Sequence, residues 1–332
     1  MGPRVVGGSD NPRKMGDLPL TRPRCHPCEQ TMHLEHHRTW PEREAWLAAA
    51  VGERARVVRT RPIGVSSTTM DAVDVADRRG RIHRFALRRY TDAARLETDP
   101  WYDPRNEARA LSLLESTDVP APRLVDLDLA GAVWGVPALL TSRIPGRTVS
   151  RPADMHRFLG ELARTLVRIH AVSATAASGL PGYAQYTPGA EICPPEWTTV
   201  PGLWEHVLCV IAGPPPSGPR AFIHRDYHPG QTLFVRGRLR GVVDWTTACT
   251  GPPDIDLARM RINLAWDFGP AVAERFVAAF ATESGRAGPH PYWELVDCAD
   301  CLPDMAEPGS ADELRELRRF ERHVASVAAA FG

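Results

Sequence analysis

The sequence predicts a two-lobed α+β fold, with a small β-rich N-terminal lobe followed by a mostly helical C-terminal lobe. Its 332 residues are more than one small hydrophobic core requires. Stretches with the two-residue periodicity of strands are concentrated before residue 144, and helical periodicity dominates after it. Between the two regions, Ile144-Pro145-Gly146 interrupts both patterns as a hinge would.

The N-terminal lobe is assigned to residues 39–144. Residues 1–38 lack periodicity and are expected to form a disordered leader. Thr39-Trp-Pro-Glu42 has the form of a capping box and predicts a helix that runs to about Ala50. Strand-like stretches are expected at 54–60, 71–77, 81–90, 121–131 and 133–144, with one helix at 104–117.

The C-terminal lobe is assigned to residues 145–332. One apolar face recurs at helical spacing and predicts a helix that ends near His170. This face consists of Met155, Leu159, Leu162, Leu166 and Ile169. Residues 181–219 are rich in proline and glycine and are expected to form an ordered insertion or a lid. Further helices are expected at 254–284, 291–304 and 311–330.

Charge and hydropathy limit the classes of partner. Forty basic and forty acidic residues cancel, so no net field favours a nucleic acid or an anionic membrane as partner. No run of about 18 apolar residues is present, and the N-terminus has no apolar signal core, so we expect a cytoplasmic protein. Lys14 is the only lysine, so a phosphate contact elsewhere in the chain must use arginine.

The seven cysteines favour reduced thiols over a disulfide framework, because their number is odd and no secretory signal is seen. Cys25 and Cys28, with histidines nearby, leave a zinc site open as an alternative. No second ligand pair follows at the spacing of a zinc finger.

Two motifs carry the candidate chemistry. His224-Arg225-Asp226 is followed, five residues after the aspartate, by Gln231. Transfer of a phosphoryl group to a hydroxyl needs a carboxylate that orients the nucleophile and accepts its proton, together with oxygen ligands for magnesium. Asp244 follows two β-branched residues, 18 residues after Asp226, which is enough for one hairpin. Two carboxylates that converge on one cleft are typical of a magnesium–phosphate site.

Residues 224–265 resemble the aminoglycoside phosphotransferase family of kinase-like small-molecule kinases, whose relatives include choline, homoserine and fructosamine kinases. The segment matches the family's His-x-Asp-x-x-x-x-Asn motif except at Gln231. It also matches the metal-binding aspartate at Asp244 and the later Asp256-Leu257-Ala258. The resemblance implies a protein-kinase-like fold. It further implies ATP (or GTP) and Mg²⁺ as cofactors for transfer to a hydroxyl of a small molecule, either an antibiotic or a metabolite.

The resemblance also implies roles for individual residues. Asp226 would be the catalytic base, Asp244 and Gln231 would hold magnesium, and His224 and Asp256 would support the loop. In the first lobe, Arg88 would contact the α- and β-phosphates and pair with Glu107. The other implied nucleotide contacts are Ser66 and Ser67 in a loop over the phosphates, and the backbone of Ser142 and Ile144 against adenine.

Two departures from the family pattern leave an alternative open. Gln231 is one methylene longer than asparagine, about 1.5 Å, and magnesium tolerates little variation in ligand distance. We therefore expect a partial defect, which Gln231→Asn would relieve. Arg88 replaces lysine, although arginine can also clamp phosphates. The alternative is a kinase-like pseudoenzyme that acts as a nucleotide-binding or partner-binding module.

The sequence leaves the acceptor open. Glu294 and Asp297 lie on an expected helix beside Tyr292 and Trp293, and they are candidates for contacts with a cationic or ring-shaped substrate. Aminoglycosides, macrolides and small metabolites all stay possible, and the oligomeric state is unknown. Arg225 makes the motif similar to that of protein kinases. However, their glycine-rich loop and Asp-Phe-Gly motif are missing, so we expect Arg225 to pack or pair within its loop.

Overall fold

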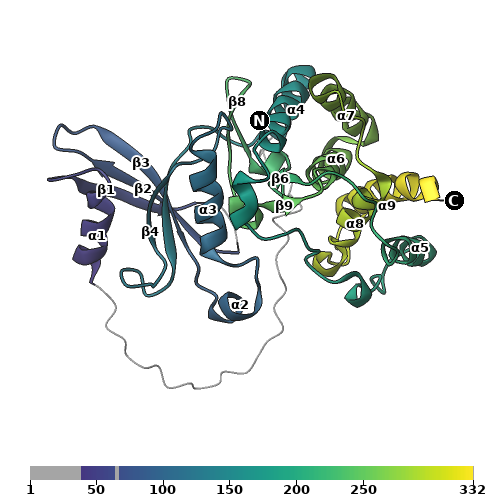
Figure 1. Ribbon diagram of the computed structural model, residues 1–332, viewed down its shortest axis with the longest axis horizontal. Helices are drawn as coiled ribbons and strands as arrows, with labels where there is room; N and C mark the ends of the chain where they lie inside the picture. Colours follow the sequence, from purple (N-terminus) through teal and green to yellow (C-terminus); the bar gives the residue numbers. More distant parts are fainter. Residues whose placement is uncertain (1–38, 64–66, 332) are drawn as a thin grey trace, which may run out of the picture.

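The computed structural model describes residues 39–63 and 67–331. The expected leader at 1–38, including Lys14 and the candidate zinc-binding cysteines, lies outside the described residues, and so does Ser66. Figure 1 shows two lobes, one built around a twisted sheet and the other around packed helices. A β-rich lobe followed by a helical lobe is the arrangement that the sequence predicts.

The first lobe contains a five-stranded antiparallel sheet in the order β1-β2-β3-β5-β4. Its strands are β1 (Arg56–Pro62), β2 (Thr69–Ala76), β3 (Ile82–Arg89), β4 (Leu124–Asp128) and β5 (Ala138–Ser142). Its helices are α1 (Trp40–Ala49), α2 (Ala93–Thr98) and α3 (Pro104–Leu114). Strand β3 lies between β2 and β5, where Arg88 pairs with Met70 on one side and Leu139 on the other. The basic residue of β3 is therefore at the centre of the sheet.

Local signals account for the helices of this lobe. The Glu42 carboxylate accepts a hydrogen bond of 2.6 Å from the backbone N–H of Thr39, as expected for the capping box that starts α1. Helix α2 was not predicted. Asp92 caps it by accepting a hydrogen bond of 3.1 Å from the Arg95 backbone N–H. With only six residues, α2 is too short to show a clear apolar period in the sequence.

The second lobe is mostly helical. Its helices are α4 (Met155–His170), α5 (Pro201–Ile211), α6 (Asp254–Phe268), α7 (Pro270–Ser284), α8 (Pro291–Ala299) and α9 (Ala311–Ala328). Two short two-stranded sheets accompany them: β6 (Ala221–Ile223) with β9 (Cys249–Gly251), and β7 (Thr232–Val235) with β8 (Arg238–Val242). Single 3₁₀ turns are η1 (Ala176–Gly179), η2 (Gly189–Glu191), η3 (Pro229–Gln231), η4 (Trp245–Thr247), η5 (Leu302–Asp304) and η6 (Ala329–Phe331). Of the helices in the described ranges, none combines the length and hydropathy needed to cross a bilayer.

Helix α4 carries the predicted apolar face into the core. Leu159, Leu162, Leu166 and Ile169 are each at most 2% exposed. Burial of each such side chain contributes about 1.5–3 kcal/mol to folding before entropy is counted. The same core includes Phe276 of α7 and Met260 of α6, so α4 and α6 are fixed relative to each other beneath the site.

The prediction of one continuous helix over 254–284 was wrong, because two helices occupy this range. Gly269 has φ +90°, a left-handed value that ends α6, and Pro270 begins α7. The prediction of one helix over 291–304 also extends too far, because α8 ends at Ala299 and a 3₁₀ turn follows.

The hinge region packs directly onto strand β8. A Cβ atom placed on Gly241 would lie 2.3 Å from the Cδ1 atom of Ile144, so no side chain fits at position 241. Arg147 forms an antiparallel bridge with Phe234 of β7. The segment that connects the two lobes is therefore packed against the β7–β8 hairpin, which leads to Asp244.

Candidate active site

A fully buried carboxylate holds the loop that follows β6. Asp256, near the start of α6, accepts hydrogen bonds from the backbone N–H groups of His224 (2.9 Å) and Arg225 (2.6 Å). It is 0% exposed and is also bonded to Nε2 of His170 at 3.1 Å. These contacts compensate for the left-handed backbone of Arg225, whose φ of +70° costs about 1–2 kcal/mol in a residue other than glycine.

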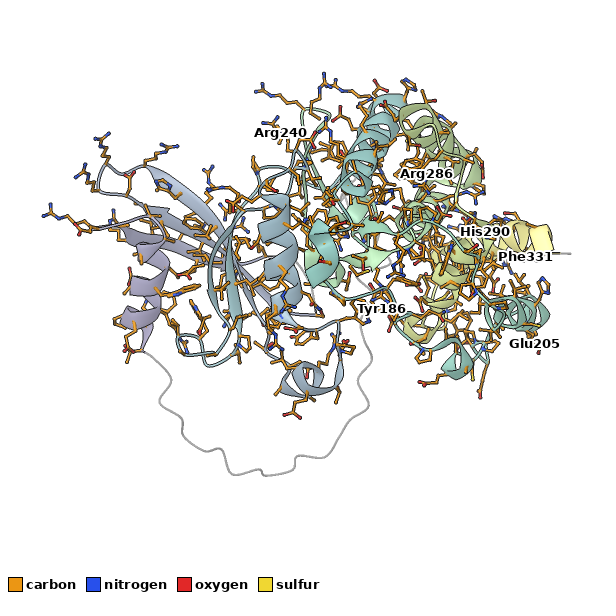
Figure 2. All side chains as sticks on the ribbon, in the orientation of Figure 1. Tyr186, Glu205, Arg240, Arg286, His290 and Phe331 are labelled. Atoms are coloured by element: carbon orange, nitrogen blue, oxygen red, sulfur yellow. The ribbon has the colours of Figure 1, made fainter. Side chains whose placement is uncertain are left out.

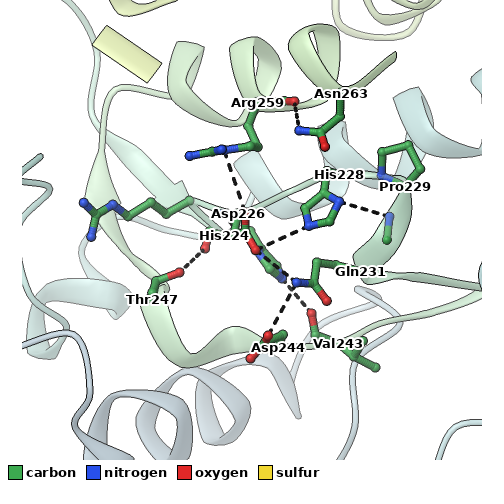
Figure 3. A network of polar contacts seen from close by, with 12 residues as sticks. His224, Asp226, His228, Pro229, Gln231, Val243, Asp244, Thr247, Arg259 and Asn263 are labelled. Atoms are coloured by element: carbon green, nitrogen blue, oxygen red, sulfur yellow. Dashed lines mark hydrogen bonds and ion pairs between the residues drawn. The ribbon is translucent and has the colours of Figure 1, made fainter. Parts of the chain in front are cut away.

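His224 links this loop to the loop after β8. Its Nε2 atom lies 3.0 Å from the carbonyl oxygen of Val243, and its Nδ1 atom accepts a hydrogen bond from the Asp226 backbone N–H at 3.3 Å (Figure 3). Because a carbonyl oxygen only accepts, this arrangement requires the tautomer with hydrogen on Nε2. The ring therefore fixes the loops that carry Asp226 and Asp244 relative to each other.

The Asp226 carboxylate is held mainly through one of its oxygens. Oδ2 accepts a hydrogen bond from the Gln231 amide at 3.0 Å and lies 3.4 Å from Nε2 of His228. Oδ1 lies 3.7 Å from Nε of Arg259. Burial opposes ionisation, but the charges and hydrogen bonds of His228, Arg259 and Gln231 outweigh it and hold the pKa of Asp226 well below its usual range. The carboxylate is therefore ionised at neutral pH, and Oδ1 is the less constrained oxygen.

Gln231 connects the two carboxylates. Its Nε2 atom lies 3.0 Å from Oδ2 of Asp226 and 3.4 Å from Oδ2 of Asp244, as Figure 3 shows. Its backbone is fixed on both sides, because its N–H donates to the His228 carbonyl and its carbonyl accepts from the Val243 N–H. The side chain thus reaches both aspartates from an anchored position.

Asp244 has a left-handed backbone, with φ +67° and ψ +60°. Its Oδ1 atom accepts hydrogen bonds from Arg88 at 2.9 Å and from the Thr246 hydroxyl at 3.2 Å. Its side chain is 28% exposed. A strained, partly exposed aspartate at a strand end is a candidate ligand site, because the backbone conformation turns the carboxylate away from the strand.

Arg88 joins the two lobes at the site. Its guanidinium lies 3.0 Å from the Glu107 carboxylate and 2.9 Å from Asp244, and it donates to the Thr68 hydroxyl at 2.9 Å. The hydroxyl of Tyr90 donates to the same carboxylate of Glu107 at 3.3 Å. Burial raises the pKa of Glu107 although Arg88 lowers it. The expected Arg88–Glu107 pair is present, and the first lobe contributes a buried cation to the same network as Asp244.

Comparison with known proteins identifies the family. The model of the phosphotransferase enzyme family matches residues 57–294, which include most of both lobes and every residue of this network. The chain belongs to this family.

The relatives agree with that assignment. A homoserine kinase from Chelativorans sp. is 28% identical over 238 residues, which cover 63% of this chain and 72% of that protein. Among solved structures, a protein from Ralstonia eutropha described as a candidate aminoglycoside phosphotransferase has a TM-score of 0.62 at 16% identity, covering 87% of this chain and 97% of the other. An amicoumacin kinase, solved in complex with AMP-PNP, Ca²⁺ and Ami, has a TM-score of 0.58 at 15% identity, covering 80% of this chain and 88% of the other. The predicted protein-kinase-like α+β fold is confirmed.

The residues expected to contact the nucleotide in this member of the family differ in exposure and in hydrogen bonding. Ser67 is exposed, and its carbonyl accepts a hydrogen bond from the Tyr102 hydroxyl. The backbone N–H of Ser142 donates to the Arg123 carbonyl at 2.9 Å, and the expected contact of the Ser142 backbone with adenine stays a prediction. Ile144 makes no backbone–backbone hydrogen bond within the described ranges, so it is the hinge position with a free N–H.

The two expected substrate residues have different surroundings. Glu294 is 1% exposed, and its oxygens are bonded to Arg261 and to His323. The expectation that Glu294 contacts a substrate is therefore wrong, because both oxygens are occupied inside the core. Asp297 pairs with Arg259 at 2.9 Å, and its Oδ2 atom has no hydrogen-bond partner in the described structure. Arg259 also faces Asp226, so this one arginine contacts both Asp297 and the candidate base.

Sequence reasoning missed His228 and Arg259. His228 lies two residues after Asp226 and packs so closely on Gly230 that a Cβ there would be 2.4 Å from its ring. That His-Pro-Gly spacing was a usable local signal. Arg259 is 33 residues downstream of Asp226 on α6, and no sequence period distinguishes it from the other arginines of the chain.

The buried acids beside Arg259 predict a pH dependence of stability. Burial raises the pKa of Asp300 from 3.8 to about 6, against the opposing charges of Arg259 and Arg225. The folded protein therefore binds more protons than the unfolded chain between about pH 4 and pH 6, so stability falls as pH rises through that window. We expect Asp300→Asn to make this fall smaller and to raise the melting temperature at pH 7.5 relative to the unmodified protein. Differential scanning calorimetry at pH 4.5 and 7.5 checks this, and an unchanged pH dependence would contradict it.

Proposed function

We propose that this protein transfers a phosphoryl group from ATP (or GTP) to a hydroxyl of a small molecule, with Asp226 as the base. The observation that carries this proposal is the continuous contact network from Asp226 through Gln231 and Asp244 to Arg88. It brings together a carboxylate for the acceptor, oxygen ligands for a metal and a cation for phosphates, which are the parts that phosphoryl transfer requires. The homoserine kinase relatives and the antibiotic kinase of similar fold support a small-molecule acceptor.

Asp226 would act through Oδ1. The other oxygen accepts from Gln231 and His228, which fix the carboxylate plane. An acceptor hydroxyl would donate its hydrogen bond to Oδ1. Its proton would move to Asp226 as its oxygen bonds to the γ-phosphorus and the bond from that phosphorus to the departing ADP (or GDP) breaks. The low pKa of Asp226 makes it a weak base. Its main contribution would therefore be to orient the hydroxyl, with proton transfer late in the reaction.

The donor set fits magnesium. In the described part of the chain, no group of three or more His, Cys, Asp or Glu is arranged as a complete metal site. Asp244 would supply carboxylate oxygens, and Gln231 would supply its amide oxygen after a flip of the amide, because its nitrogen now faces both aspartates. Magnesium commonly combines one or two protein ligands with phosphate and water oxygens. When bound there, the ion would neutralise charge on the phosphates.

Arg88 would contact the nucleotide phosphates. Its Nε atom is taken by Glu107, which fixes the guanidinium plane, while Nη1 and Nη2 reach Thr68 and Asp244. Phosphate oxygens could replace either of the last two contacts without disturbing the first. The arginine can therefore serve the role implied for the usual lysine.

The experiment that tests the proposal combines binding with turnover. Thermal shift would be measured with ATP and with GTP, each with and without Mg²⁺. Nucleotide consumption would then be followed against L-homoserine, an aminoglycoside, a macrolide and a no-acceptor control. We expect Mg²⁺-dependent stabilisation and acceptor-dependent consumption. Magnesium-independent binding without turnover of any acceptor would favour the alternative of a nucleotide-binding or partner-binding module, and no nucleotide binding would count against both.

Gln231→Asn tests how the site uses the longer side chain. The partial defect expected from the sequence stays untested, but the contacts favour the opposite outcome. An asparagine on the same anchored backbone would be about 1.5 Å shorter and could not contact Asp226 and Asp244 together. We therefore expect Gln231→Asn to lower turnover and to raise the Mg²⁺ concentration for half-maximal rate. Steady-state kinetics over a Mg²⁺ titration, with Gln231→Glu as a length-matched control, would decide. A faster asparagine variant would restore the first expectation.

A further inference from the structure

Arg225 lies inside a cage of aromatic rings. Its guanidinium carbon is 3.5 Å from the ring centroid of Tyr186, 3.8 Å from that of Trp101 and 5.3 Å from that of Tyr183. Trp101 and Tyr186 meet edge to face with centroids 6.3 Å apart. Short distances of this kind between a cation and aromatic faces are typical of strong cation–π contacts. Trp101, Tyr183 and Tyr186 are called the aromatic cage below.

The cage is assembled from both lobes. Trp101 belongs to the connection between α2 and α3 of the first lobe, whereas Tyr183 and Tyr186 belong to the segment after α4 in the second. Figure 2 shows Tyr186 at the junction of the lobes. Trp101 and Tyr183 also pack on the buried residues Ile223 and Cys249 of the second lobe. The position of the cage is therefore fixed by tertiary contacts on both sides.

The rings, and not a carboxylate, provide the direct contacts to this cation. Arg225 is only 1% exposed, and within the described ranges it forms no ion pair. Its Nη2 atom donates to the Ala184 carbonyl, while Nε and Nη1 have no hydrogen-bond partner. Asp300 and Asp297 interact with the charge electrostatically, without an ion pair to Arg225 in the described structure. A buried cation enclosed in this way occupies a site that would suit any cation of similar size.

The cage lies beside the acceptor side of the candidate active site. Arg225 immediately precedes Asp226 in the chain, and Tyr186 interacts electrostatically with Asp226. The Tyr186 hydroxyl also interacts with the side chain of Thr247, three residues after Asp244. The residue that fills the cage is therefore next in the chain to the carboxylate that would hold the acceptor hydroxyl.

We propose that Arg225 is a specificity-determining residue that fills the aromatic cage with its own guanidinium and so keeps cationic groups of an acceptor out of it. The acceptor class that follows is a hydroxyl compound whose group beside the reacting hydroxyl is uncharged. This statement about the acceptor rests on the proposed function. The occupation of the cage by Arg225 can be tested without any turnover.

Arg225→Gly is the variant that empties the cage. Position 225 has φ +70°, which glycine adopts without strain, so the backbone favours this substitution. Tetramethylammonium chloride would be titrated against the variant and the unmodified protein, with tryptophan fluorescence as the signal. Neopentyl alcohol serves as the neutral probe of similar shape, and sodium chloride as the ionic-strength control. We expect Arg225→Gly to bind tetramethylammonium about tenfold more tightly than the unmodified protein does, with no such gain for the alcohol.

Two further variants show whether the gain comes from the cage. The double variant Trp101→Leu/Arg225→Gly should lose this gain in tetramethylammonium affinity, because the Trp101 ring no longer forms one side of the cage. Arg220→Ala, which removes an exposed arginine whose one hydrogen bond among residues 39–63 and 67–331 is to the Thr250 carbonyl, should bind like the unmodified protein. Equal tetramethylammonium binding by Arg225→Gly and the unmodified protein overturns the proposal. So does an equal gain for the neutral alcohol.

A second measurement keeps the proposal testable if Arg225→Gly does not fold. Phenylglyoxal labelling followed by peptide mass spectrometry reports the accessibility of Arg225 itself. We expect Arg225 to be protected in the unmodified protein and to become reactive in Trp101→Leu. Equal protection in both proteins would show that the cage does not enclose the guanidinium. Neither measurement needs phosphoryl transfer, so a failed acceptor screen would count against the proposed function alone.

Discussion

Replacement of Asp226 by alanine is expected to lower phosphoryl transfer by about a hundred- to ten-thousandfold while nucleotide binding changes little. The carboxylate is the group positioned for the acceptor, because Gln231 and His228 fix one oxygen and leave Oδ1 less constrained. Its loss removes both the orienting hydrogen bond and the proton acceptor. Nucleotide binding should survive because Arg88, Glu107 and Asp244 form a network that does not contact Asp226 directly.

The measurement is the rate of acceptor-dependent nucleotide consumption, together with the thermal shift produced by Mg-ATP. Asp226→Asn is the informative companion, because it keeps the shape of the side chain but cannot accept the proton. Asp304→Ala, an exposed carboxylate in the same lobe, is the control and should leave the rate unchanged. Normal turnover by Asp226→Ala would show that another group is the base.

Replacement of Asp256 by alanine is expected to lower the free energy of unfolding by about 3–5 kcal/mol and to abolish turnover. The carboxylate is fully buried and accepts hydrogen bonds from the backbone N–H groups of His224 and Arg225, and it also contacts His170. Alanine would leave these buried donors without partners and would release the left-handed backbone at Arg225. Asp226 would then lose its position although it is unchanged chemically.

Urea unfolding followed by circular dichroism measures this change. Asp254→Ala is a matched control on the same helix, because Asp254 forms an ion pair with Arg286 at 2.7 Å in a partly exposed position. It should cost only about 1 kcal/mol. A similar loss of stability in both variants would contradict the assignment of Asp256 as the support of the loop.

The short-range features of the site could be predicted from the sequence. Asp226 and Gln231 lie on one loop, and Asp244 lies at the end of the next hairpin, so spacing alone brings them together. The pairing of Arg88 with Glu107 was expected only through resemblance to a family, and the structure contains that pair. The family and the fold are confirmed, whereas the catalytic, metal and nucleotide roles of these residues stay predictions.

The errors and omissions have a common physical cause. Glu294 lies on a helix with other acids, and its burial against Arg261 and His323 depends on how α6, α8 and α9 pack. The place of Arg259 beside Asp226 was missed because it depends on how α6 packs against the loop that carries Asp226. Helical and strand periods show which side of an element is apolar. They do not show which neighbour covers the other side.

The sequence by itself determined the two-lobed order of strands and helices and the local spacing of Asp226, Gln231 and Asp244. Only the tertiary structure decided that Arg88 reaches Asp244 across 156 residues of chain, and that Trp101 closes over Arg225 from the other lobe. Periodicity and spacing reflect interactions between residues a few positions apart. The partners and the burial of a charged side chain depend on segments that meet only when the whole chain packs.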